Sequence, residues 1–233
     1  MKKLLTVLTA VGVLAGVALA EEVTSVNIVG YKKHTFESGK LHLVSSQFQS
    51  IDGSPVNAET LIGDQLPYGS EIFSWNAKKV GGPGYESSER VLVFPVVDGW
   101  GEDLKLDGTK GFWVSPGGPT GMTYEVAFLG EVPLMDVVTN VIAGTITMTA
   151  YPYTADIAFT NTQLFAQSEE GDQMFIWDPD TQYSSYEYVV VFPILDGWGA
   201  AAEALVLTQG TGIWYDRASS NDLQIVDIRP YLN

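Results

Sequence analysis

Two carboxylates occupy equivalent places in a segment that the sequence contains twice. The segment reads VFPVVDGWG from residue 93 and VFPILDGWG from residue 191, so Asp98 and Asp196 each precede a glycine. A pair of carboxyl groups is what a glycosidase uses to cleave a sugar linkage. Each aspartate belongs to a separate copy, however, and an aspartate before glycine in a turn usually bonds its own backbone. We therefore predict structural roles for Asp98, Gly99, Asp196 and Gly197, and an acid-pair glycosidase is the remote alternative.

Two further pairs of aspartates could bind a metal ion. Asp103 lies four residues before Asp107, and Asp178 lies two residues before Asp180. Carboxylate oxygens close together in loops are the ligands that Ca²⁺ prefers. Neither pair spells a complete calcium-binding loop, and a chain with 28 acidic residues contains such pairs by chance. We predict no cofactor, with calcium at these four aspartates as the alternative.

Nucleophilic catalysis and zinc binding would find few suitable side chains here. The sequence has no cysteine and two histidines, His34 and His42. A catalytic serine or threonine needs a base beside it, and zinc sites are built mainly from histidine and cysteine. His42 alternates with Leu41 and Leu43 along an expected strand, so we expect its side chain to face solvent. We predict that the protein is not an enzyme and has no catalytic residues.

Closely spaced tyrosines offer a binding function of another kind. Tyr183, Tyr186 and Tyr188 lie within six residues, and Tyr151 and Tyr153 form a second group. Residues two apart on a strand share a face, and exposed aromatic rings in exported β proteins often stack on sugars. These five tyrosines are candidate carbohydrate-binding residues. The alternative is that they face the core or a neighbouring strand.

The duplicated segment is the strongest part of a longer internal repeat. Residues 69–75, for example, match residues 171–177. All six tryptophans fall into matched pairs, which are Trp75 with Trp177, Trp100 with Trp198, and Trp113 with Trp214. Every copy of a domain needs its core, whereas it does not need its ligand. We therefore predict that the six indoles are structural and fill the domain interiors.

The local sequence pattern indicates β-structure. Short segments rich in Val, Ile, Phe, Tyr and Thr alternate with turn signals, and helix signals are confined to residues 57–62 and 160–165. In the duplicated segment, Asp-Gly is expected to form a turn, with the following Trp folding back over the preceding strand. We predict an all-β protein of two tandem, duplicated domains, each a small β-sandwich or partly open barrel with one short helix. Their boundaries are residues 21–130 and 131–233.

The first 20 residues have the three parts of a secretory signal peptide. Lys2 and Lys3 precede an apolar run, and Ala18-Leu19-Ala20 places small residues just before Glu21. The apolar run is shorter than the ~20 residues of a spanning helix, so we expect no membrane span after the leader is cleaved. The mature chain, from Glu21 onward, is therefore predicted to be exported.

The charge of the mature chain excludes some partners. Without Lys2 and Lys3 the chain carries 10 basic and 28 acidic residues, which gives a net charge of −18. Such a chain repels nucleic acid. Because it has no cysteine, packing of its hydrophobic residues, 45% of the sequence, must hold the fold without disulfides. We predict no nucleic-acid partner, and the expected partners are other envelope proteins, another copy of the chain, or polysaccharide.

The motifs together resemble a family of exported tandem β-repeat proteins of environmental Gram-negative bacteria. The motifs that carry the resemblance are VNIVGY at residues 26–31, LHLVSS at 41–46, the segment 60–76, GW at 99–100, GFWV at 111–114 and GEVP at 130–133. The second copy departs from the pattern, because it has GIWY at residues 212–215. The family has no established activity, so the resemblance implies a fold and export but no catalytic residue.

We therefore expect an exported, non-enzymatic structural or interaction protein of the cell envelope or extracellular space. The resemblance places it in the periplasm, at the cell surface or in the medium of a Gram-negative bacterium. A carbohydrate-binding module that uses exposed Tyr or Trp is the alternative function.

Overall fold

The computed structural model describes residues 28–51, 53–93, 97–191 and 195–231. The predicted signal peptide, residues 1–20, lies outside the described residues. The prediction of an all-β protein is confirmed, because 45% of the described residues lie in strands and the sheets are small and antiparallel. None of the helices in the described ranges is long and apolar enough to span a membrane.

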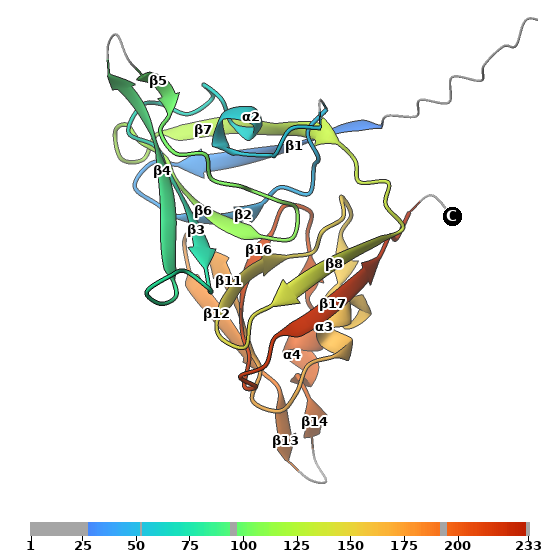
Figure 1. Ribbon diagram of the computed structural model, residues 1–233. Coiled ribbons are helices and arrows are strands. Elements are labelled where there is room, and N and C mark those ends of the chain that lie inside the picture. Colours follow the sequence, from blue (N-terminus) through green and yellow to red (C-terminus); the bar gives the residue numbers. More distant parts are fainter. Residues whose placement is uncertain (1–27, 52, 94–96, 192–194, 232–233) are drawn as a thin grey trace, which may run out of the picture.

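The first half of the described chain, residues 28–131, forms a five-stranded sheet and a two-stranded ribbon (Figure 1). The sheet has the order β2-β6-β3-β4-β5, and β1 pairs with β7 in the ribbon. The strands are β1 (Val29–Glu37), β2 (His42–Ser45), β3 (Glu71–Asn76), β4 (Gly84–Val93), β5 (Val97–Trp100), β6 (Gly111–Ser115) and β7 (Thr123–Glu131).

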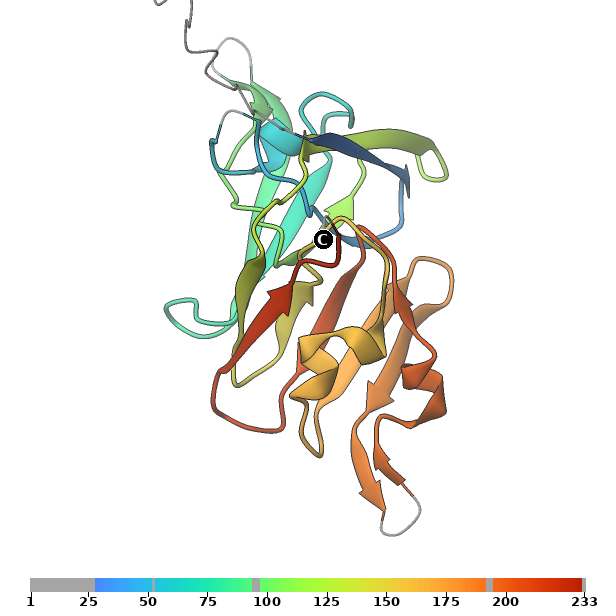
Figure 2. The same ribbon diagram turned by 90° about the vertical axis from the view of Figure 1, so that its right-hand side faces the viewer.

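The second half, residues 137–231, lies below the first in Figure 1 and has a four-stranded sheet of order β12-β11-β16-β9. Its two-stranded ribbon is β8 paired with β17, and the hairpin β13–β14 projects from its far end (Figure 2). The strands are β8 (Val137–Ile142), β9 (Thr147–Ala150), β10 (Ile157–Ala158), β11 (Gln173–Asp178), β12 (Gln182–Glu187), β13 (Val189–Val191), β14 (Leu195–Gly197), β15 (Val206–Leu207), β16 (Gly212–Asp216) and β17 (Leu223–Ile228). The sequence repeat matches β2 with β9, β6 with β16, β3 with β11 and β4 with β12. These four strands have the same order in both sheets, and β5 is added at the edge of the first sheet.

Short helices lie where the sequence signals placed them. Asn57 caps α2 (Ala58–Leu61), with its side chain accepting from the Thr60 N–H at 2.8 Å while the Thr60 hydroxyl accepts from the Asn57 N–H at 3.0 Å. Thr162 caps α3 (Gln163–Ala166), which follows the 3-10 turn η1 (Phe159–Asn161). Side-chain oxygens of this kind satisfy N–H groups that the first turn leaves free. The sequence did not indicate α4 (Gly199–Glu203), which begins directly after the second DGW segment.

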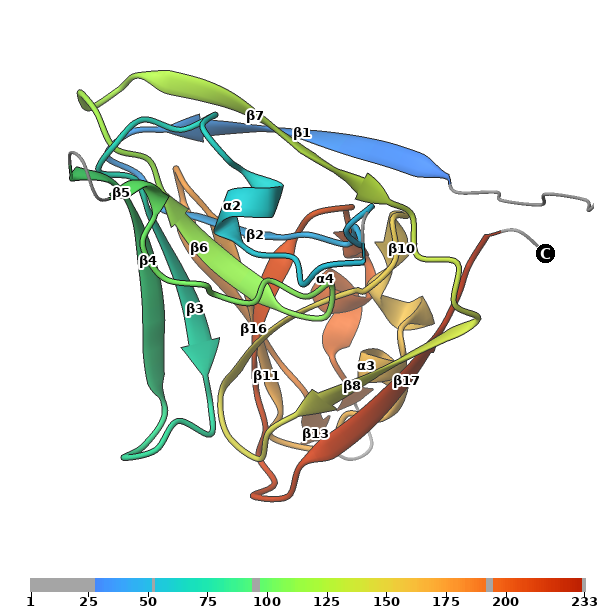
Figure 3. The same cartoon turned by 45° about the horizontal axis from the view of Figure 1, so that its top comes forward.

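Each half has its own apolar core between its sheet and its ribbon. In the first half, α2 lies beside the ribbon and contributes to the core (Figure 3). The main buried side chains there are Phe36, Phe48, Leu61, Ile62, Leu66, Ile72, Phe112, Val126 and Phe128. Those of the second half are Ile142, Phe159, Leu164, Met174, Trp198, Leu207, Ile213, Tyr215 and Ile225.

The predicted turn at Asp-Gly is wrong. Asp98 and Gly99 lie within β5, opposite Leu92 and Val91 of β4. Gly99 has φ 140° and Gly197, in β14, has φ 141°. Positive φ suits glycine in a distorted strand as well as in a turn, which is why the sequence signal was ambiguous.

The tryptophan that follows each Asp-Gly anchors the segment beside a helix of its own half. The Trp100 Nε1–H donates to the Gly63 carbonyl at 2.9 Å, just after α2, and the indole packs on the first core. The Trp198 Nε1–H donates to the Ser168 hydroxyl at 2.7 Å, just after α3, and the indole is buried in the second core. Each indole therefore attaches a β-hairpin, β4–β5 or β13–β14, to the residues that follow the helix α2 or α3 of the same half.

Candidate functional site

The other four tryptophans lie between the two halves. Trp75 of β3 meets Trp214 of β16 with ring centroids 5.3 Å apart, and Trp177 of β11 meets Trp113 of β6 at 5.1 Å. In the sequence repeat, Trp75 matches Trp177 and Trp113 matches Trp214. Both contacts therefore join equivalent positions of the repeat. In each contact, the tryptophan of β3 or β11 comes from one half and the tryptophan of β16 or β6 comes from the other half. Trp113 and Trp214 are only 4% and 5% exposed. With Leu43 and Met148 they form a buried cluster at the interface between the two sheets, called the joint below, which is separate from the core of either half.

Hydrogen bonds across the joint repeat the same exchange. The Trp75 Nε1–H donates to the Ile146 carbonyl at 2.9 Å, and the Trp177 Nε1–H donates to the Leu41 carbonyl at 2.6 Å. Leu41 and Ile146 are themselves matched positions in the repeat. Two backbone hydrogen bonds across the joint are also equivalent in the repeat. The Ser45 N–H donates to the Gly210 carbonyl at 2.9 Å, and the Ala150 N–H donates to the Thr109 carbonyl at 3.0 Å.

Two matched glycines allow the sheets to come this close. A Cβ on Gly212 would lie 2.7 Å from the Val44 carbonyl oxygen, and one on Gly111 would lie 3.2 Å from the Gly212 Cα. Side-chain carbons are not found at 2.7 Å from a backbone oxygen, so the first contact would push the halves apart. The first glycine of GIWY, Gly212, is therefore needed for the joint, and a side chain at Gly111 of GFWV would make the contact tight.

An open aromatic cleft lies at one side of the joint. It has a volume of about 450 Å³ and is lined by Leu41, Phe73, Tyr85, Trp113, Ser115, Trp177 and Tyr183. Tyr85 and Tyr183 are 46% and 49% exposed, so solvent reaches the cleft. Burial, followed by the neighbouring Tyr85, raises the pKa of the Tyr183 hydroxyl above its ordinary value, so this hydroxyl is protonated at neutral pH.

Three rings in the wall of the cleft stand nearly perpendicular to one another. The planes of Trp113 and Trp177 make an angle of 88°, and Tyr183 makes angles of 80° with Trp113 and 69° with Trp177. Their centroids lie 4.7–6.5 Å apart. Edge-to-face contacts of this kind contribute about 0.5–1.5 kcal/mol each beyond the area that they bury. The matched set Trp75, Tyr85 and Trp214 has the same arrangement, with angles of 73–86°.

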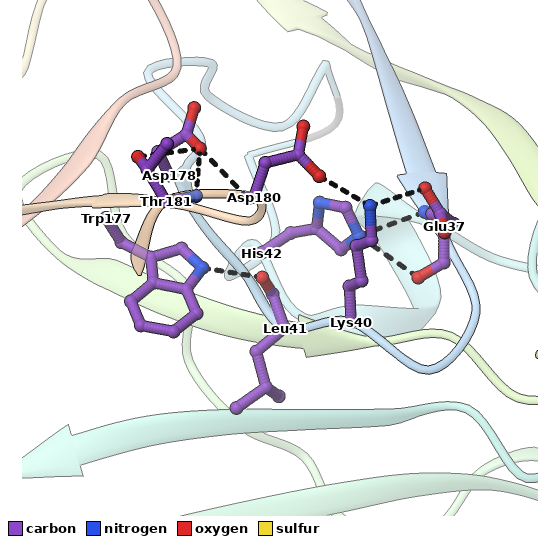
Figure 4. A network of polar contacts seen from close by, with 8 residues as sticks. All are labelled: Glu37, Lys40, Leu41, His42, Trp177, Asp178, Asp180 and Thr181. Atoms are coloured by element: carbon purple, nitrogen blue, oxygen red, sulfur yellow. Dashed lines mark hydrogen bonds and ion pairs between the residues drawn. The ribbon is translucent and has the colours of Figure 1, made fainter. Parts of the chain in front are cut away.

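Charged side chains lie beside the Trp177 end of the cleft (Figure 4). The Lys40 ammonium contacts Asp180 at 2.6 Å and Glu37 at 2.8 Å, and thereby ties the β11–β12 turn to the first half. The Asp178 carboxylate accepts from the backbone of Asp180 and Thr181, at 2.9 Å and 2.8 Å. The Thr181 and Asp180 N–H groups lower the pKa of Asp178.

His42 does not face solvent as we expected. It is buried, and its Nε2 accepts from the Glu37 N–H at 2.9 Å. The expectation failed because all four residues of β2 are buried, between the first core on one side and the second half on the other. Burial is the main cause that lowers the pKa of His42.

The candidate carbohydrate-binding tyrosines do not form one surface. Tyr183 lines the cleft, whereas Tyr186 and Tyr188 pack against the core of the second half. Tyr151 and Tyr153 are buried, and the Tyr153 hydroxyl donates to backbone carbonyls at 3.2 Å. A buried ring offers no face to a sugar, so the prediction that Tyr151 and Tyr153 bind carbohydrate is wrong. Both are interior residues.

The candidate calcium ligands are engaged by the protein itself. Asp103 accepts from the Asn57 amide at 2.6 Å, and Asp107 accepts from the Thr109 hydroxyl at 2.5 Å. Asp178 and Asp180 make the contacts described above. Within the described ranges, no three His, Cys, Asp or Glu side chains gather in a way that could hold a metal ion.

The two aspartates of the glycosidase alternative do not share a site. Asp98 accepts from the Tyr68 hydroxyl at 2.8 Å in β5, at the outer end of the first half. Asp196 lies in β14, at the opposite end of the molecule (Figures 1 and 2). Carboxylates that act on one glycosidic bond lie within about 10 Å of each other. The strands that carry Asp98 and Asp196 therefore lie far from each other in one chain and do not bring the two residues together.

His34 adds a titratable ring to the contact between the halves. It packs on Phe128 of β7 at 4.5 Å between centroids, and a side chain at Gly210 of the second half would collide with it. Its Nε2 is buried and has no hydrogen-bond partner among the residues described. Burial, then the charges of Lys32 and His42, lowers the pKa of His34 from 6.5 to about 4.

We expect stability to fall when the solution is acidified because of His34. Between pH 6.5 and pH 4 the unfolded chain binds a proton that folded His34 does not, so the free energy of unfolding decreases as the pH falls. The decrease is about 3 kcal/mol, since each pH unit corresponds to about 1.4 kcal/mol. Urea unfolding of the native protein and of His34→Phe, compared between pH 4 and pH 7, measures it.

The comparison with His34→Phe is needed because Asp227 raises the free energy of unfolding as the pH falls, whereas His34 lowers it. Burial raises the pKa of Asp227 to about 6, and its proton uptake favours the folded state as the pH falls. This contribution is the same in both proteins. Equal pH dependence of the two proteins would contradict the role of His34.

The sequence indicated only part of this site. Trp113, Trp177 and Tyr183 were singled out, whereas Leu41, Phe73, Tyr85 and Ser115 were not. A signal for Tyr85 existed, because it precedes Phe94 by nine residues as Tyr183 precedes Phe192. Fold and site together define an all-β protein with an aromatic cleft at the joint between two sheets. Comparison with protein families, with curated proteins and with solved structures finds no match to this chain.

Proposed function

We propose that this chain is an exported, non-enzymatic interaction protein of the cell envelope or extracellular space, and that the aromatic cleft holds its ligand. The cleft carries the proposal. Its volume of about 450 Å³ lies in the range of small-molecule sites, which are mostly apolar and aromatic with few polar groups.

The exposure of Tyr85 and Tyr183 supports a binding role for the cleft. Each ring is about half exposed, although the neighbouring Trp113 of the joint is buried. Exposed aromatic surface that lies together in a hollow is typical of binding sites. The predicted leader and the resemblance to exported tandem β-repeat proteins support the location and stay predictions.

A ligand screen on the whole mature chain tests the proposal. The melting temperature and the tryptophan fluorescence are measured with three kinds of probe: soluble β-glucan oligosaccharides, alkylated amines and neutral alcohols. We expect one kind to raise the melting temperature, because a ligand that binds only the folded state stabilises it. The shift should be lost in Tyr183→Ala and kept in Tyr31→Ala, a change on β1 at a ring that is 71% exposed.

Two outcomes of this screen would contradict the proposal. One is that none of the three kinds of probe has an effect. The other is an effect of the same size in Tyr183→Ala, which would place the binding site elsewhere. Binding of the oligosaccharides through Tyr183 would instead support the carbohydrate-binding alternative.

A further inference from the structure

We propose that the cleft recognises an organic cation whose nitrogen carries methyl groups in place of hydrogens, that is, a quaternary ammonium group. This inference rests on the proposed function and names the ligand class of the same site. It follows from the arrangement of the rings, from the scarcity of polar groups in the lining, and from the charge around the cleft.

Ring faces are the attractive groups in the cleft. A cation within about 6 Å of the centroid of a Trp, Tyr or Phe ring is attracted to the face of that ring, and Trp gives the strongest attraction. Trp113, Trp177 and Tyr183 pack edge to face on one another, and Tyr183, at 49% exposed, leaves part of its ring open to the cleft. Phe73 and Tyr85 complete the aromatic lining. Tyr85 and Tyr183 are the most exposed of these rings, so a compact cation in the cleft can lie against both.

The lining has few groups that could satisfy a polar ligand. Apart from the hydroxyls of Ser115, Tyr85 and Tyr183, its side chains are apolar or indole rings whose N–H groups are used in part by the joint. A sugar ring or a primary amine would lose hydrogen bonds to water on the side that faces the apolar lining and would find few partners there. A quaternary ammonium has no N–H group, so it loses none of these bonds when water leaves the cleft.

The electrostatic environment favours a positive ligand. None of the described residues that line the cleft is Lys, Arg or His. At its Trp177 end lie the carboxylates of Glu37, Asp178 and Asp180, with the ammonium of Lys40 between Glu37 and Asp180. The full chain carries a net charge of −16. A negative field around a hollow with apolar walls concentrates cations there.

A pair of probes of equal shape and different charge tests the inference. Choline is compared with its neutral isostere, in which carbon replaces the quaternary nitrogen, and a β-glucan oligosaccharide serves as the third probe. Dissociation constants are measured by tryptophan fluorescence and calorimetry on the mature chain. We expect choline to bind about fivefold more tightly than the isostere, because cation–π attraction at exposed rings amounts to about 1 kcal/mol.

Variants of one residue connect the binding to the rings. Tyr183→Phe keeps the ring and should bind choline nearly as the native protein does. Tyr183→Ala removes one wall and should weaken binding about tenfold. Tyr31→Ala changes an exposed ring on β1 and should have no effect. A circular dichroism melt of each variant shows whether it is folded.

The outcomes separate this inference from the proposed function. Equal affinity for choline and its isostere would overturn the inference and leave an apolar binding site. Binding of the oligosaccharide alone, lost in Tyr183→Ala, would also overturn it and would make the ligand a carbohydrate. If none of the three probes binds in a way that depends on Tyr183, both proposals are wrong.

Discussion

Replacing Trp214 by alanine is expected to lower the free energy of unfolding by about 3–5 kcal/mol, and replacing Trp113 to lower it by a similar amount. Both indoles are almost wholly buried, in a cluster with Leu43 and Met148 from the two strands that face them. Each also receives the edge of a second indole, Trp75 or Trp177. Truncation removes these contacts and leaves a hole that two rigid sheets cannot close.

Urea unfolding followed by far-ultraviolet circular dichroism measures this loss. The control is Tyr31→Ala, where the ring is largely exposed on β1 and the change should stay within about 0.5 kcal/mol. A loss below about 1 kcal/mol in Trp214→Ala would show that the indole does not fill the joint.

The shape of the transition distinguishes a joint from an ordinary core. With the joint intact, we expect both halves to unfold in one cooperative step, because the buried tryptophan cluster couples them. The double variant Trp113→Ala/Trp214→Ala removes both centres of that contact while each half keeps its own core. We expect it to unfold in two steps. One sharp step at much lower stability would mean that the two cores are not independent.

Local features of the fold could be predicted from the sequence because short-range chemistry fixes them. Asn57 and Thr162 begin helices through bonds that span three residues, and both positions were indicated by residue type. Alternation of apolar and polar residues indicated strands such as β7, whose burial alternates over its central residues. The all-β class follows from many such local signals.

The joint could not be predicted because it depends on contacts between distant parts of the chain. Matched tryptophans are expected in a duplicated core and in a reciprocal interface alike, and the sequence does not show which face of β6 or β16 meets the other half. The same holds for His42, whose strand has neighbours on both sides. Tyr151 and Tyr153 were misassigned for this reason too, since their positions next to β9 are covered by residues far along the chain, such as Asp227.

The candidate site could be predicted in part, because it combines a local sequence signal with contacts between distant parts of the chain. Tyr183 was indicated by its spacing to other tyrosines, yet the cleft consists of residues from both halves and exists only when β6 and β11 face each other. Residue type therefore indicated the chemistry, an aromatic binding surface. The topology decided which rings take part.

A buried carboxylate in the second half gives the other large expected effect. Asp172, directly before β11, is fully buried and accepts from the Tyr215 hydroxyl at 2.6 Å, from the Ala218 N–H at 2.9 Å and from the Glu169 N–H at 3.1 Å. Burial, and next the bond to Asp172, raises the pKa of Tyr215, so this hydroxyl stays a donor. One carboxylate thus ties the start of β11 to the end of β16.

We expect Asp172→Ala to lower the free energy of unfolding by about 3–5 kcal/mol, because it leaves a buried hydroxyl and two backbone N–H groups without their acceptor. The first half suggests a matched rescue. Ser70 occupies the position of Asp172 there, its hydroxyl accepts from the Gly117 N–H at 2.8 Å, and Val114 stands in place of Tyr215.

The double variant Asp172→Ser/Tyr215→Phe copies the first half's arrangement into the second. A serine hydroxyl can accept from the Ala218 N–H, and phenylalanine has no hydroxyl to satisfy. It should therefore recover at least about 1 kcal/mol relative to Asp172→Ala, measured by urea unfolding at pH 7. If the double variant is no more stable than Asp172→Ala, the carboxylate acts through its charge and not through the bonds that a serine can replace.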